Sequence, residues 1–134
     1  MPKRRRQPTW IDRIVLDAVQ LDQIREHGGL SGIRDENALE SALARPRNRW
    51  QYEPDTGVAE LAAAYGWGLT AGHPYRDGNK RIGFLAMAVF LELNGCELRA
   101  SDAEVVQLML SVADHGMTER EVADWIRSHV RVKR

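Results

Sequence analysis

Apolar residues recur at helical spacing along most of this sequence. The densest run covers residues 82–93, where only Gly83 and Glu92 interrupt the apolar side chains. A segment that is apolar on nearly all sides is predicted to be a buried helix at the centre of the domain. This helix is expected to extend over residues 78–94 and to end in a left-handed turn at Gly95.

Five further helices are predicted around it, so the expected fold class is all-α with about six helices. Two of them open with capping-box patterns, Ser101-x-x-Glu104 and Thr118-x-x-Glu121, each ahead of a periodic apolar run. The other three are predicted to span residues 12–27, 35–44 and 56–71.

The composition of these three helices predicts how each one packs. Helix 56–71 is rich in Ala and Gly, so we expect it to lie directly against the buried helix. Helix 35–44 has Asp35 as its expected N-cap. Helix 12–27 is expected to bury a face formed by Ile14, Val15, Ala18, Val19, Leu21 and Ile24.

The segment 45–54 reads differently from its neighbours. Pro46 is expected to end the preceding helix, and arginines then alternate with aromatics up to Pro54. This pattern is typical of an exposed loop or a small two-stranded, β-like flap. Core packing does not explain three arginines in such a loop, which leads to the hypothesis that it contacts a protein target. The residues proposed for this contact are Arg47, Asn48 and Arg49.

Length and composition restrict the class of protein. A chain of 134 residues is long enough for one hydrophobic core, and no apolar run reaches the roughly 18 residues that span a bilayer. Because the N-terminus is Arg-rich and lacks an apolar signal region, a cytoplasmic location is expected. The single cysteine, Cys96, is interpreted as a small buried hydrophobe.

The net charge of zero hides an uneven distribution. Basic tails are predicted at residues 1–9, expected to be disordered, and 131–134, on either side of a folded domain at 10–130. Residues 8–130 hold twelve basic and nineteen acidic groups, so the body is acidic. Six of those twelve cations cluster in two short segments, which suggests a bound anion. They are Arg45, Arg47, Arg49, Arg76, Lys80 and Arg81.

The turn before the buried helix carries the groups that phosphate chemistry requires. Free amide groups at a helix N-terminus bind anions, and Gly78 and Asn79 occupy that position. Lys80 and Arg81 add positive charge for a polyphosphate. Asp77 would repel phosphate unless a cation lay between them, and Mg²⁺ suits one carboxylate combined with phosphate oxygens.

His73 lies four residues before Asp77 and is the candidate general base, because histidine titrates near neutral pH. A lone histidine is more often structural, and His27, His115 and His129 are interpreted in that way. The combination of His73 with a carboxylate, a glycine, an amide and two cations favours phosphoryl or nucleotidyl transfer.

The nine residues His73-Pro-Tyr-Arg-Asp-Gly-Asn-Lys-Arg81 resemble the signature of the Fic/Doc superfamily, in particular its Doc (death-on-curing) toxin branch. The segments around Gly28-Gly29, Arg34-Asp35 and Arg45-Pro46 add to the resemblance. It implies a Fic/Doc fold and a toxin of a type II toxin–antitoxin system that uses ATP and Mg²⁺ to modify a protein hydroxyl. By position, the general base would be His73, the metal ligand Asp77, and the ATP ligands Gly78, Asn79, Lys80 and Arg81.

Two positions indicate which group is transferred. Lys80 stands where Fic adenylyltransferases typically have a glycine, and Phe84 stands where they have a second arginine. The resemblance therefore implies a Doc-type, inverted nucleotide and transfer of the γ-phosphate to a Ser/Thr hydroxyl, with elongation factor Tu as the target and translation arrest as the result. Tyr75 replaces the family's usual phenylalanine, and Gly78 an alanine common in Doc.

The resemblance also implies a partner. Because the chain lacks the family's self-inhibitory helix pattern, inhibition is expected in trans from a small antitoxin, often a DNA-binding repressor. No direct contact with nucleic acid or membrane is expected. Two alternatives stay open: a Fic-type adenylyltransferase that transfers AMP, and a non-catalytic antitoxin-binding module that modulates repression.

Overall fold

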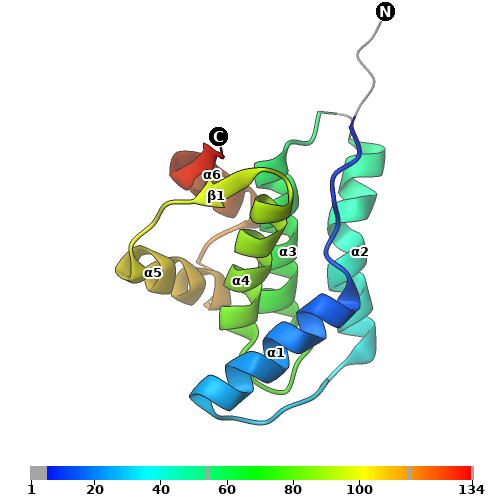
Figure 1. Cartoon of the computed structure of the whole chain (residues 1–134), viewed down its shortest axis with the longest axis vertical. Helices are drawn as coiled ribbons and strands as arrows, with labels where there is room; N and C mark the ends of the chain where they lie inside the picture. The colour runs from blue at the N-terminus through cyan, green and yellow to red at the C-terminus, as the bar shows by residue number, and fades with distance from the viewer. Residues whose placement is uncertain (1–5, 54, 115, 134) are drawn as a thin grey trace, which may run out of the picture.

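The computed structural model describes residues 6–53, 55–114 and 116–133. These residues form six α-helices and one two-stranded antiparallel sheet (Figure 1), which confirms the predicted all-α class. The helices are α1 (Arg13–His27), α2 (Glu36–Tyr52), α3 (Val58–Gly72), α4 (Asn79–Leu93), α5 (Asp102–Ala113) and α6 (Glu119–His129), and the strands are β1 (Cys96–Leu98) and β2 (Val130–Val132). The predictions for residues 1–5 of the basic tail and for His115 lie outside the described residues.

Helix α3 is the central element of the domain. It packs against α4, α2, α6 and α5, and Figure 1 shows it between α2 and α4. Nine of its fifteen residues are buried, against six of the fifteen in α4. The buried helix predicted from residues 82–93 therefore exists, but the neighbouring helix is more central, because Phe84 and Leu85 of α4 are only half-buried.

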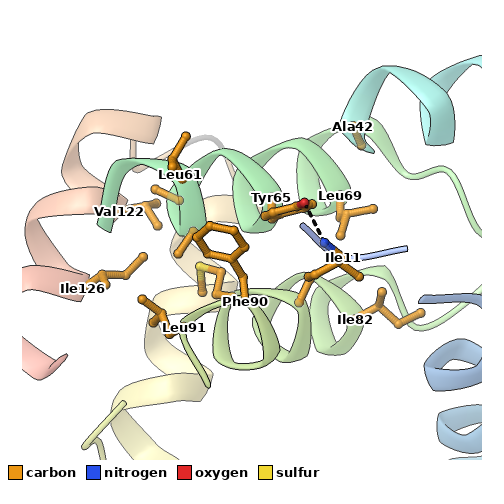
Figure 2. Packing of buried hydrophobic residues seen from close by; sticks show 14 of the residues in the cluster. Ile11, Ala42, Leu61, Tyr65, Leu69, Ile82, Phe90, Leu91, Val122 and Ile126 are labelled. Carbon is orange, nitrogen blue, oxygen red and sulfur yellow. Dashed lines mark hydrogen bonds between the residues drawn. The ribbon is translucent and has the colours of Figure 1, made fainter. Parts of the chain in front are cut away.

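Small residues bring α3 and α4 together, as predicted. A Cβ atom at Gly83 would overlap Thr70 Oγ1 and lie 2.9 Å from the carbonyl oxygen of Gly66. Figure 2 shows the core between the two helices, where the rings of Tyr65 and Phe90 lie 5.2 Å apart. The hydroxyl of Tyr65 accepts a hydrogen bond from the amide of Ile11 at 3.1 Å, so the N-terminal segment is fastened to the core.

The predicted end of the second helix is wrong. Helix α2 continues through Pro46 to Tyr52, so residues 45–52 of the segment expected to be a flap are helical, while Pro54 lies outside the described residues. Proline removes one helical hydrogen-bond donor, but Pro46 is buried, and Ala42, one turn earlier, packs on α3. The strands form elsewhere, with Cys96 pairing with Val132, which belongs to the predicted C-terminal tail.

The predicted buried face of α1 is also wrong. Ile14 is 82% exposed, and Val15 and Leu21 are exposed as well, while the buried residues are Leu16 and Gln20. Helix α1 contacts α4 and lies across one end of the bundle (Figure 1), so only a narrow edge of it meets the core. The buried glutamine has its hydrogen-bond partners in two loops, at Leu30, Gly32 and Asp77, and hydrophobic periodicity does not detect such a residue.

The caps of the last two helices follow the sequence pattern. Ser101 Oγ accepts a hydrogen bond from the amide of Glu104, and Thr118 Oγ1 accepts one from the amide of Glu121. The side chains of both glutamates in turn accept a hydrogen bond from the backbone amide of the capping residue, which completes the two capping boxes. No described helix is both long and apolar enough to cross a membrane.

Candidate phosphate-binding and catalytic site

The loop between α3 and α4, residues 73–78, carries the sequence motif and has unusual backbone geometry at both ends. His73 adopts a left-handed conformation with φ 47°, which no other described non-glycine residue shares. Gly78 at the other end has φ 79°, a value that glycine adopts without strain. A left-handed non-glycine residue costs roughly 1–2 kcal/mol, so the surrounding structure must hold His73 in place.

Tyr75 anchors the middle of the loop in the core. Its side chain is 2% exposed, and its hydroxyl donates a 2.7 Å hydrogen bond to Asp17 of α1. Burial, followed by the bond to Asp17, raises the pKa of Tyr75 well above its ordinary value, so the hydroxyl stays protonated and acts as a donor. The expected aromatic anchor is therefore present, and its hydroxyl has a partner.

Asn79 closes the loop on itself. Its side-chain Oδ1 accepts from the amide of Tyr75 at 3.0 Å, and its Nδ2 donates to the carbonyl of Tyr75 at 2.9 Å. The first backbone bond of α4 runs from Ile82 N–H to the Gly78 carbonyl, so the amides of the three residues between them have no partner within the helix. The backbone of this helix end, more than the Asn79 side chain, is thus free to bind an anion.

The motif loop opens into a cavity of about 610 Å³, a size that suits a small-molecule ligand. Its polar side contains every residue predicted for catalysis, metal and phosphate binding: His73, Asp77, Gly78, Asn79, Lys80 and Arg81, together with Arg76. Its apolar side comes from α4 and α5 and consists of Phe84, Leu85, Val105, Val106, Met109 and Leu110, while Gln23 of α1 completes the lining. A cavity with one charged and one apolar side matches a nucleotide, which has charged phosphates at one end and an aromatic base at the other.

The α5 side of this cavity was missed by sequence reasoning. The apolar positions 105, 106, 109 and 110 have helical spacing, which also describes an ordinary core face. In the structure, Val106 is 57% and Leu110 is 44% exposed, so they line the cavity and do not fill the core. The sequence gives no signal that distinguishes these two uses.

Asp77 presents a carboxylate to the cavity. Its Oδ2 accepts a 2.6 Å hydrogen bond from the amide of Leu30, in the segment between α1 and α2. Among the described residues, no group of three or more His, Cys, Asp or Glu side chains is placed to hold a metal ion. A metal at Asp77 would need most of its ligands from phosphate and water, which fits Mg²⁺ better than metals that require a protein cage.

The arginines of α2 lie outside this cavity. Arg45 forms an ion pair with Glu119 of α6 at 2.7 Å, and Arg49 approaches the same carboxylate at 3.8 Å. The guanidinium of Arg47 lies over the ring of Trp10 at 5.7 Å. These contacts give the three arginines a structural explanation, and target contact through Arg47, Asn48 and Arg49 stays a prediction.

Comparison with known proteins agrees with the fold and the motif. A model of the Fic/DOC family matches residues 10–91, which contain α1 to α3, the motif loop and most of α4. The chain is 32% identical over 104 residues to "Protein kinase doc" of Escherichia phage P1, an alignment that covers 78% of this chain and 82% of the phage protein. It is 35% identical over 74 residues to "Toxin Doc" of Mycolicibacterium smegmatis, covering 54% and 57% of the two chains.

The protein is a helical domain in which one loop brings a histidine and a carboxylate to the N-terminus of a helix. Together with the match to the family model, this arrangement shows that the chain belongs to the Fic/DOC family. Its similarity to the two Doc proteins makes it a Doc-type member of that family.

Proposed function

We propose that this chain is a Doc-type toxin that transfers the γ-phosphate of ATP to a Ser or Thr hydroxyl of a protein. The observation that carries the proposal is that His73, Asp77 and the amino end of α4 line the same cavity. The name of the phage relative, "Protein kinase doc", supports phosphate transfer, and the name of the mycobacterial relative, "Toxin Doc", supports a role as a toxin.

Each residue of the cavity then has a chemical task. The free amides at the start of α4, with Lys80 and Arg81, bind and orient the phosphate oxygens. His73 accepts the proton of the incoming hydroxyl as that oxygen attacks the γ-phosphorus, while the bond from this phosphorus to the β–γ bridging oxygen breaks and ADP leaves. Asp77 holds Mg²⁺, which when bound neutralises charge on the phosphates and aligns them.

Lys80 favours phosphate transfer over AMP transfer. It replaces the glycine of typical Fic adenylyltransferases, and a lysine side chain at the amino end of α4 leaves less room for the α-phosphate beside the base. Phe84, in the place of their second arginine, removes one polyphosphate ligand from the cavity. Both differences favour a nucleotide whose γ-phosphate faces the acceptor.

We further propose elongation factor Tu as the acceptor and a cognate small antitoxin, itself a DNA-binding repressor, as the inhibitor. The support for both is the Doc-type motif and the similarity to the proteins named "Protein kinase doc" and "Toxin Doc". Phosphorylation of the factor would arrest translation, and the antitoxin would act in trans.

The proposal is tested with ATP labelled on either the γ- or the α-phosphate, incubated with the protein, Mg²⁺ and elongation factor Tu. We expect label on the factor from the γ position alone. His73→Ala should abolish it, whereas His27→Ala, at an exposed histidine outside the cavity lining, should not. Label from the α position would replace the kinase with an adenylyltransferase, and growth inhibition that survives both His73→Ala and Asp77→Ala would indicate a non-catalytic module.

A further inference from the structure

We propose that the connector between α1 and α2, residues 28–35, is a positioning element that fixes the base and the carboxylate of the motif loop relative to each other. Arg34 holds His73, and the backbone of Leu30 holds Asp77. The inference rests on the proposed function for the chemical roles of His73 and Asp77. The contacts themselves are independent of that function.

Arg34 holds the histidine end of the loop. Its Nε donates a 2.7 Å hydrogen bond to the carbonyl of His73, and a terminal guanidinium nitrogen donates a 3.1 Å bond to the carbonyl of Gly72. A planar guanidinium binds two neighbouring carbonyls at once, and its charge is favourable at the carboxyl end of α3. These two bonds hold the left-handed backbone of His73, and that backbone sets the direction in which its Cβ atom leaves the chain.

The connector also follows the middle of the loop. The amides of Arg34 and Asp35 both donate to the carbonyl of Pro74, at 2.8 and 3.0 Å, and the amide of Arg76 donates to the carbonyl of Gly32 at 3.0 Å. Ile33 and Tyr75 form an isolated antiparallel bridge between these bonds. The two segments therefore run antiparallel and side by side, although they are far apart in the sequence.

The other end of the connector holds the carboxylate. Leu30 N–H donates to Asp77 Oδ2 at 2.6 Å, and the buried side chain of Gln20 makes longer contacts of 3.4 to 3.5 Å with the carbonyls of Leu30 and Asp77. Gly29 lies directly against the carboxylate. A Cβ atom there would be 3.1 Å from Asp77 Oδ2, whereas one at Gly28 would meet nothing within 4 Å.

Arg34 is thus a positioning residue, and Arg34→Ala should lower kcat for phosphate transfer by roughly tenfold while KM for ATP stays within about twofold. Arg34→Lys should recover part of the loss, because an ammonium group can still donate to one of the two carbonyls. Arg99→Ala, which removes a guanidinium paired with Glu97 outside the cavity lining, is the matched control and should retain wild-type kcat. An unchanged kcat in Arg34→Ala would overturn the role of Arg34.

The contact of the connector with Asp77 is tested with alanine substitutions at two glycines that both have positive φ. Gly28 and Gly29 both have positive φ, 80° and 113°, so alanine is strained at either position. Only Gly29→Ala also pushes on Asp77, so it alone should raise the Mg²⁺ concentration required for half-maximal activity, by about tenfold, and in metal-free protein it should shift the NMR signals of Asp77 more than Gly28→Ala does. Equal Mg²⁺ requirements in the two variants would overturn this half of the proposal.

A structural readout separates this inference from the proposed function. In the NMR spectrum, the Cα chemical shift of His73 reports its left-handed backbone, and we expect it to move in Arg34→Ala but not in Arg99→Ala. If the wild-type protein transfers no phosphate, the proposed function fails and this shift still tests the connector. If the wild-type protein is active while Arg34→Ala keeps both its kcat and the His73 shift, the inference alone fails.

Discussion

At the scale of single residues, the motif loop is held by partners that are distant in sequence. Asp17 accepts a hydrogen bond from Tyr75, 58 residues away, and Leu30 donates one to Asp77, 47 residues away. The nine-residue motif therefore supplies the chemical groups, and other parts of the chain supply their geometry. The loop residues could be predicted from sequence, but these partners could not, because no local pattern encodes a contact between separate segments.

Tyr75→Phe tests the anchor of the loop. The ring stays buried and only the bond to Asp17 is lost. That carboxylate is partly exposed, so we expect a loss of about 1 kcal/mol in the free energy of unfolding and nearly unchanged transfer activity. Urea unfolding measures the first quantity, with Tyr52→Phe as the control at a 77% exposed tyrosine. Loss of activity without loss of stability would show that the Tyr75 hydroxyl has a chemical role that we do not assign to it.

At the scale of elements, the packing of α3 against α4 determines where the motif loop lies, since the loop joins the two helices. The close approach depends on glycines at the contact, because the facing helix lies so near that a methyl group at these positions would overlap it. Sequence composition predicted this pair correctly. It did not predict the path of α2, because a buried proline that is tolerated inside a helix looks the same in sequence as a proline that ends one.

Gly83→Ala should destabilise the protein by about 1–3 kcal/mol, because its Cβ atom would overlap Thr70 and press on the backbone of Gly66. Gly68→Ala is the matched control in α3. There the nearest atoms lie at 3.6 Å, an ordinary contact, so the gain in helix propensity should leave stability unchanged or raise it by up to about 1 kcal/mol. Thermal or urea unfolding of both variants checks the difference, and equal effects would contradict the packing described for α3 and α4.

At the scale of the whole molecule, α5 and α6 extend the domain beyond the part matched by the family model, and α5 forms the apolar side of the cavity together with α4. His129, the last residue of α6, fastens the two helices. Its Nδ1 lies 2.7 Å from the carbonyl of Trp125, and its Nε2 lies 2.8 Å from Glu104, the glutamate of the α5 capping box. This contact confirms the structural role interpreted for His129 from sequence.

Two acceptors around one ring favour the imidazolium. The carbonyl of Trp125, followed by Glu104, raises the pKa of His129 above its ordinary value of 6.5. The amide of Ser101, followed by His129, lowers the pKa of Glu104, so that carboxylate stays ionised near neutral pH. Because the folded state holds the proton of His129 more tightly than the unfolded state, the stabilisation is complete below about pH 6.5 and is lost as the pH rises through the raised pKa.

His129→Gln should therefore reduce the loss of stability that the wild-type protein shows as the pH rises from about 6.5. The measurement is the midpoint of urea unfolding as a function of pH. His27→Gln, at an exposed histidine of α1, should retain the wild-type slope. If the urea midpoint of His129→Gln falls with pH as steeply as that of the wild-type protein, the imidazolium of His129 does not stabilise the contact between α5 and α6.

The central claim is that the cavity transfers phosphate from ATP to an acceptor protein. The mass of the acceptor protein after the reaction tests this claim most directly. Elongation factor Tu is incubated with the protein, ATP and Mg²⁺, and its intact mass is compared with that from a parallel reaction with His73→Ala. We predict an increase by one phosphate group, located on a Ser or Thr and absent with the variant. An increase by the mass of AMP, or an equal phosphate gain with His73→Ala, would contradict the claim that this cavity is a histidine-dependent kinase site.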